Sequence, residues 1–293
     1  MLPTSLNSKY CFRAPGAKAP SLGFSESFWA LTGREISIEL SLERACSAGF
    51  EYFEVGLRED RLAMAEALLR DFPLKLIAQG WATTFFEAEV FLDRARKLGA
   101  VALNLHLGHA YMTADEAISL VGQVQHRADS VGLPLLLETH RGRLTQDLFC
   151  TAEVLARSPE TIIALDVSHY IVAGETLGGS EELFHKHILP LLTRTALVHG
   201  RISNGQSIQV SLDDPFASTA AIGSLWSRAM RIWLANAPPD AVFVFEPELG
   251  PTPYAYLDKS GAETFNRSAE TTKLIELARA AWSKAQNDAV IAL

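Results

Sequence analysis

A series of short apolar segments, each followed by a segment of helical pattern, most constrains how this chain can fold. Leu, Ile, Val and Phe run nearly continuously through these segments, which is typical of parallel strands covered on both faces. The eight predicted strands span residues 24–31, 49–57, 74–81, 100–108, 134–142, 162–170, 195–203 and 241–250.

The helices between these strands have recognisable starts and ends. Thr84 with Glu87, and Thr113 with Glu116, match the capping box that satisfies the first N–H groups of a helix. Eight strands alternating with eight helices favour a parallel (β/α)8 barrel (TIM barrel) of the α/β class. The alternative, an open doubly wound sheet, would carry a Gly-rich turn after its first strand, and "FWALTGREIS" (28–37) contains none. We therefore predict a single barrel domain over 24–293, preceded by an N-terminal arm over 1–23 that packs on the outside or is partly loose.

Composition excludes several classes of protein. A chain of 293 residues has the size of one barrel, and no apolar segment reaches the roughly 18 residues that a membrane helix needs. The N-terminus has no signal-peptide pattern, and three cysteines without C-x-x-C spacing indicate a reducing, cytoplasmic setting. A net charge of −8 argues against nucleic acid as a partner, because such proteins usually carry a basic face.

Four successive predicted strands end in residues that can bind metals. The fifth strand carries Glu138, the sixth Asp166, the seventh His199, and the eighth both Glu246 and Glu248. The first three lie four positions after the start of their strands, so we expect them at one level of the barrel mouth. Catalytic groups of such barrels gather at this C-terminal end.

Several carboxylates in one small cavity repel each other unless something neutralises them. A divalent cation does so, and an oxygen-rich set with one imidazole suits Mn²⁺, Mg²⁺, Co²⁺ or Zn²⁺. Each acid alone is better explained as a salt bridge or helix cap, but four successive strands together favour one metal site.

Four motifs carry a family resemblance: "LLLETHRG" (135–142), "ALDVSH" (164–169), "LVHGR" (197–201) and "FEPELGPTPY" (245–254). In this order they resemble the xylose isomerase-like barrel superfamily, in its sugar phosphate isomerase/epimerase group, over about residues 24–255. The resemblance implies one divalent metal held by Glu138, Asp166, His199 and a glutamate of "FEPEL". One family pattern selects Glu246 and another selects Glu248, so both stay candidates; being two apart on a strand, they share a face.

Further pocket residues are expected around this set. His169 follows Asp166 by three, as in the family's D-x-x-H pattern, and would bind a substrate hydroxyl or support the metal site. Arg201 follows His199 by two and would face the same cavity. Other candidate substrate-binding residues at or near strand ends are His106, His140, Glu54 and Trp81.

The reaction that the resemblance implies is isomerisation or epimerisation of a small sugar or related polyhydroxylated carbonyl compound. Glu138 and Glu246 (or Glu248) would remove and return the proton next to the carbonyl, through a metal-stabilised enediolate. The alternatives are a dehydratase of the inosose dehydratase type, an endonuclease IV-like phosphodiesterase, and a non-catalytic barrel that binds a metabolite. Homo-oligomers are also implied, since dimers or tetramers are usual in these families.

Overall fold

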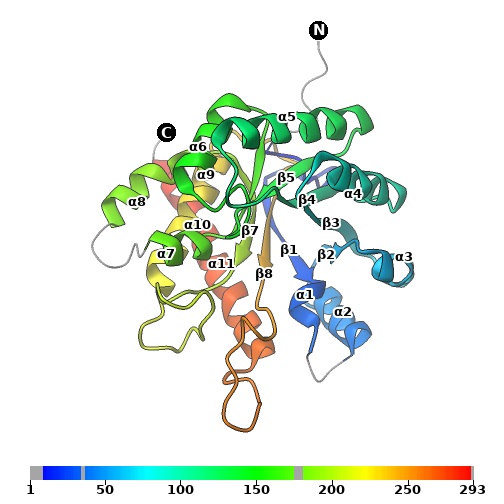
Figure 1. Cartoon of the computed structure of the whole chain (residues 1–293). Helices are drawn as coiled ribbons and strands as arrows, with labels where there is room; N and C mark the ends of the chain where they lie inside the picture. Colours follow the sequence, from blue (N-terminus) through cyan, green and yellow to red (C-terminus); the bar gives the residue numbers. More distant parts are fainter. Residues whose placement is uncertain (1–8, 34–36, 175–180, 292–293) are drawn as a thin grey trace.

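Eight parallel strands close into a barrel in the order in which they occur along the chain, as the (β/α)8 prediction requires (Figure 1). This computed structural model describes residues 9–33, 37–174 and 181–291. The strands are β1 (Ser21–Ser27), β2 (Tyr52–Gly56), β3 (Lys75–Ala82), β4 (Ala102–Leu107), β5 (Leu135–Glu138), β6 (Ile162–Leu165), β7 (Thr195–Gly200) and β8 (Val242–Pro247).

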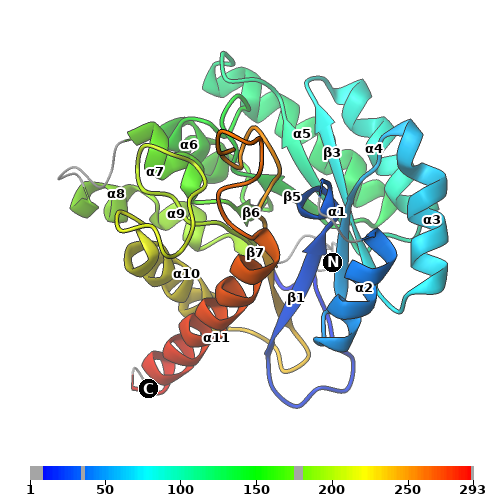
Figure 2. The ribbon, with the colours of Figure 1, turned by 90° about the horizontal axis from the view of Figure 1, so that it is seen from below.

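Helices surround the barrel on the outside, and α10 (Thr219–Leu234) and α11 (Arg267–Ile291) run side by side against β7 and β8 (Figure 2). Both predicted capping boxes are present, at the starts of α4 and α5. Within the described ranges, no helix is long and apolar enough to cross a membrane. The helices are α1 (Phe28–Leu31), α2 (Ile38–Ser47), the 3-10 helix η1 (Glu59–Arg61), α3 (Leu62–Asp71), α4 (Phe85–Lys97), α5 (Ala114–Val131), α6 (Leu148–Arg157), α7 (Ser168–Gly174), α8 (Glu181–His187), α9 (Leu189–Leu192), α10 (Thr219–Leu234) and α11 (Arg267–Ile291).

The inside of the barrel changes from apolar to polar along the strands. Residues nearer the strand starts form one buried apolar cluster, which includes Ile77, Leu136, Leu197 and Val244. Side chains two positions further along a strand point to the same face. Those positions hold Gln79, Glu138, His199 and Glu246, all of them buried. The polar half of the barrel interior is therefore its C-terminal half.

The N-terminal arm differs from its prediction. Phe12 is buried in the apolar cluster inside the barrel, with its ring 5.3 Å from that of Tyr52. The described part of the arm thus closes the N-terminal end of the barrel and does not merely pack on its outside; residues 1–8 lie outside the described part. The first strand begins earlier than predicted, because β1 starts at Ser21, which pairs with Val242 of β8.

Five predicted strands, those over 24–31, 134–142, 162–170, 195–203 and 241–250, extend three or more residues too far at their C-terminal ends. Residues 28–31 form helix α1, because the side chain of Ser27 caps the N–H of Ala30. β5 ends at Glu138, and β6 ends at Leu165 before α7 begins at Ser168. After β5 and β6, the polar residues that follow the apolar run belong to a loop and to a helix start, whereas the apolar residues 28–31 already form a helix.

Candidate active site

A single histidine lies at the centre of four buried glutamates. Nε2 of His199 is 3.7 Å from Glu54 and 3.9 Å from Glu246, and Nδ1 is 3.5 Å from Glu138 and 3.3 Å from Glu248. The five residues form two triads that share His199, with the ligand atoms of each triad within 4.8 Å of one another. The structure therefore brings Glu138, His199 and both candidate glutamates of β8 together, and adds Glu54 of β2.

Burial and crowding perturb the protonation of these groups. Burial disfavours the charged form of His199, but the carboxylates of Glu248, Glu138 and Glu54 outweigh it and hold the pKa of the imidazole well above its usual range. Burial, reinforced by the charge of Glu54, raises the pKa of the Glu246 carboxyl well above its usual range. The positive charge of this one imidazole thus offsets much of the negative charge of the surrounding carboxylates.

The donor set fits a divalent cation. Among the described residues, neither ring nitrogen of His199 has a hydrogen bond of regular geometry, although both are fully buried. Buried polar atoms normally have partners, so unpaired donors beside several carboxylates suggest that a ligand completes the site. Carboxylate oxygens with one imidazole are suitable ligands for Mn²⁺, Mg²⁺, Co²⁺ or Zn²⁺.

Asp166 lies beside this group but in neither triad. Its Oδ2 is 3.0 Å from Nη1 of Arg201, and its Oδ1 accepts a hydrogen bond from the N–H of Ser168. Burial raises the pKa of Asp166, although the Arg201 charge acts in the opposite direction. Of the ligands that the resemblance implies, Asp166 is one whose carboxylate is already paired with an arginine.

Arg201 is buried and joins β6 to the segment after β8. Its Nη2 donates to Oε2 of Glu248 at 2.7 Å, and its Nε donates to the Glu248 carbonyl at 3.0 Å. Its guanidinium lies over the ring of Tyr254 at 4.7 Å. Burial raises the pKa of Glu248, but His199 and Arg201 outweigh it and the net shift is downward. Arg201 lines the cavity as predicted, and its guanidinium contacts both Asp166 and Glu248.

Two amides that the sequence analysis missed orient the carboxylates. Nδ2 of Asn104 donates to Glu54 at 3.1 Å and to Glu138 at 2.6 Å, and Nε2 of Gln79 donates to Glu54 at 2.8 Å. His106 also contacts Glu138, with 2.9 Å between Nε2 and Oε2. Asn104 lies two positions before His106, so the alternation of the strand could have indicated that it shares the interior face.

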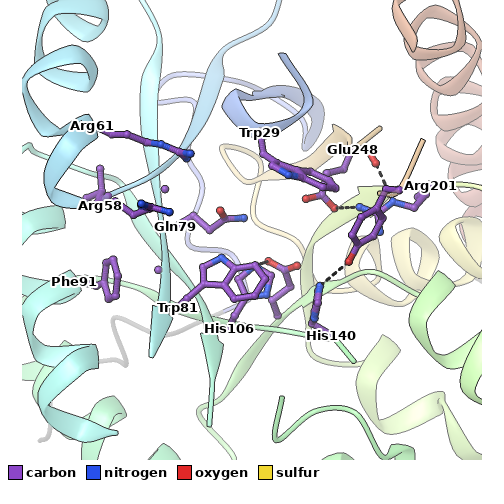
Figure 3. Close-up of a pocket in the computed structure, with 15 residues that line it drawn as sticks. Trp29, Arg58, Arg61, Gln79, Trp81, Phe91, His106, His140, Arg201 and Glu248 are labelled. Carbon is purple, nitrogen blue, oxygen red and sulfur yellow. Dashed lines mark hydrogen bonds and ion pairs between the residues drawn. The ribbon is translucent and has the colours of Figure 1, made fainter. Parts of the chain in front are cut away.

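A cavity of about 580 Å³ opens onto Glu138 and Glu248 of the two triads (Figure 3). Three rings form one wall of the cavity: Trp81 stacks on His106 at 4.1 Å, and His106 lies 4.8 Å from His140. Behind this wall, the ring of His169 lies 4.1 Å from that of His140. Nε2 of His140 is 3.2 Å from the hydroxyl of Tyr254. Burial, aided by the charge of His106, lowers the pKa of His140 to about 4, so its ring is neutral at pH 7.

The cavity separates the predicted residues into two groups. Glu138, His106, His140, Arg201, Glu248 and Trp81 line it, together with Trp29, Arg58, Arg61 and Tyr254. Glu54, Asp166, His169, His199 and Glu246 are buried without belonging to its lining. Glu248 therefore faces the open space, whereas Glu246 lies deeper.

Known proteins resemble this chain in structure more than in sequence. No family model and no curated protein matches the sequence. D-psicose 3-epimerase from Clostridium cellulolyticum H10, solved with D-tagatose, matches with a TM-score of 0.60 at 13% identity, over 89% of this chain and 99% of its own. A xylose isomerase-like TIM barrel protein from Mycobacterium smegmatis, in complex with magnesium, matches with a TM-score of 0.59 at 11% identity, over 90% and 98%.

A probable 3-DHS dehydratase from Bacillus anthracis, involved in petrobactin synthesis, has a TM-score of 0.57 at 15% identity, over 87% of this chain and 98% of its own. At these identities the three proteins show that the chain shares their barrel fold.

Proposed function

We propose that this protein belongs to the xylose isomerase-like superfamily and is a divalent-metal-dependent isomerase or epimerase of a small polyhydroxylated carbonyl compound. The observation that carries the proposal is the position of His199 among four glutamates beside a cavity. The shared fold with D-psicose 3-epimerase and with a magnesium-bound barrel supports it.

The ligands that we propose for the metal are His199, Glu138 and Glu248, with Glu246 and Asp166 close by. Once bound, the metal would supply Lewis-acid stabilisation of the negative charge that develops on a carbonyl oxygen. The chain contributes these buried ligand atoms, with Glu138 oriented by Asn104 and Glu248 by Arg201.

Proton transfer is assigned to Glu138 and Glu248, because both line the cavity and both contact the same nitrogen of His199. One carboxylate takes the proton from the carbon next to the carbonyl, and the other delivers a proton to the same or the adjacent carbon. Burial alone would raise the pKa of Glu138, but His106 and His199 outweigh it and hold the pKa well below its usual range. Glu138 is therefore ionised and able to accept a proton, although a low pKa makes it a weaker base than an unperturbed glutamate.

Dehydration is the second candidate, and the shared fold with a probable dehydratase favours it. It begins with the same proton abstraction but then expels a hydroxyl from the neighbouring carbon. A product lighter than its substrate by one water would identify this reaction.

The test is exchange of solvent deuterium into a panel of ketoses and keto-acids with Mn²⁺ or Mg²⁺ present. The wild type should exchange the proton next to the carbonyl, and Glu138→Gln should abolish this exchange while remaining folded. Glu153→Gln is the matched control, since this glutamate is half exposed on α6. Retained exchange in Glu138→Gln would refute the assigned base.

A further inference from the structure

Two arginines that no part of the proposed mechanism uses line the cavity at one end. Figure 3 shows Arg58 and Arg61 pointing into it beside Gln79, on the side opposite Glu248 and Arg201. They follow β2, where Arg58 precedes η1 and Arg61 is its last residue. The N–H of Arg61 donates to the carbonyl of Arg58 at 3.0 Å, so one tight turn presents both side chains.

The turn is held from outside the cavity by Arg94 of α4. Its Nη1 donates to the carbonyl of Leu57 at 2.9 Å, and its Nη2 pairs with Glu59. Arg94 thereby engages one of the two acids of the turn. The other acid, Asp60, pairs with Arg58 across 3.2 Å between two well-exposed side chains, an ion pair of little strength.

Among the described residues Arg61 forms no ion pair, and its guanidinium lies 4.9 Å from the ring centre of Phe28. The two acids that line the cavity are engaged elsewhere: Glu138 by His106 and His199, and Glu248 by Arg201. An uncompensated guanidinium in a cavity indicates an anionic group on the ligand.

Glycine keeps the space beside this arginine open. A Cβ at Gly56 would lie 3.5 Å from both Nη1 of Arg61 and Oε1 of Gln79, so any longer side chain would fill the gap between them. Gln79 in turn donates to Glu54 of the deeper triad, which connects the cationic end of the cavity to the carboxylate group.

We propose that the substrate carries a terminal oxyanion, a phosphate or a carboxylate, that binds Arg61 and Arg58 while its carbonyl end faces Glu138 and Glu248. This inference rests on the proposed function, because it describes another part of the same substrate. A guanidinium is suited to either group, since its fork of N–H donors matches two oxygens of a carboxylate or a phosphate.

The test compares binding of inorganic phosphate, D-fructose, D-fructose 6-phosphate and D-fructuronate to the full chain by calorimetry. We expect the wild type to bind phosphate, and to bind one of the two anionic ketoses at least about tenfold more tightly than D-fructose. In Arg61→Met, phosphate binding and this affinity ratio should each fall about tenfold or more, and Arg58→Met should lower them less. Preference for the 6-phosphate or for D-fructuronate identifies the oxyanion.

The matched control is Arg70→Met on α3, since Arg70 is well exposed and away from the cavity lining. It should bind all four probes as the wild type does. A wild-type ratio near one, or an unchanged ratio in Arg61→Met, overturns the inference. If neutral ketoses exchange with solvent but the protein does not bind an anionic ketose more tightly than D-fructose, the anion site is refuted and the proposed function is retained. Discrimination without exchange into any ketose supports the anion site and refutes the isomerase.

Discussion

Replacing Arg201 by Met should destabilise the metal-free protein strongly, because two buried acids depend on it. Nη1 lies 3.0 Å from Asp166 and Nη2 lies 2.7 Å from Glu248, and all three side chains are buried. Removing one partner of a buried ion pair costs about 3–5 kcal/mol. At about 2.1 cal/mol/K of unfolding entropy per residue, a chain of this length loses about 1.6 °C in Tm per kcal/mol. The expected fall is therefore about 5–8 °C.

Differential scanning calorimetry in EDTA measures this fall, and Arg127→Met is its control. Arg127 also contacts two acids, Glu89 at 2.9 Å and Asp93 at 2.8 Å, but its side chain is partly exposed. Exposed pairs contribute about 0–1 kcal/mol each, so the control should lose about 3 °C at most. If Arg201→Met melts no lower than Arg127→Met, the bridge does not stabilise the fold. Added Mn²⁺ should stabilise Arg201→Met more than the wild type, since the two freed carboxylates lie close to His199.

Three further predictions follow from other parts of the structure. Gly250→Ala should displace Trp29, because a Cβ there would lie 1.8 Å from its ring; a shifted tryptophan emission and a raised KM would show this, and an unchanged spectrum would contradict it. Phe12→Ala should lower the free energy of unfolding in denaturant by about 3–5 kcal/mol, because it leaves a cavity at the N-terminal end of the barrel, and metal binding should be unchanged. A loss below about 1 kcal/mol would disprove that role. Since the carboxylates of Glu248, Glu138 and Glu54 outweigh burial and hold the pKa of the His199 imidazole well above its usual range, metal binding should displace protons and strengthen as pH rises. Calorimetry in two buffers of different ionisation enthalpy measures these protons, and zero proton release would refute this.

The barrel and the depth of its polar residues could be predicted from sequence because both depend on local periodicity. A nearly continuous apolar run that ends in a polar residue indicates where a parallel strand reaches the mouth of the barrel, which placed Glu138 and His199 correctly. Alternation along a strand also predicted that Glu246 and Glu248 share a face. Alternation could not decide whether Glu246 or Glu248 lines the cavity. That depends on how far β8 runs before the chain leaves the barrel.

Contacts between distant segments could not be predicted in the same way. The pairing of Asp166 with Arg201 depends on the reach of a long side chain across two strands, and the burial of Phe12 depends on an arm closing the far end of the barrel. Arg58 and Arg61 have the pattern of an exposed helix start, and only the fold shows that they face the cavity.

Metal content with an anomalous difference map tests the central claim most directly. After dialysis against Mn²⁺, the wild type should retain about one ion per chain, with a single anomalous peak beside His199 between Glu138 and Glu248. His199→Ala should retain far less and show no peak there. A wild type without bound metal, or a peak elsewhere with His199→Ala loaded equally, would contradict the account.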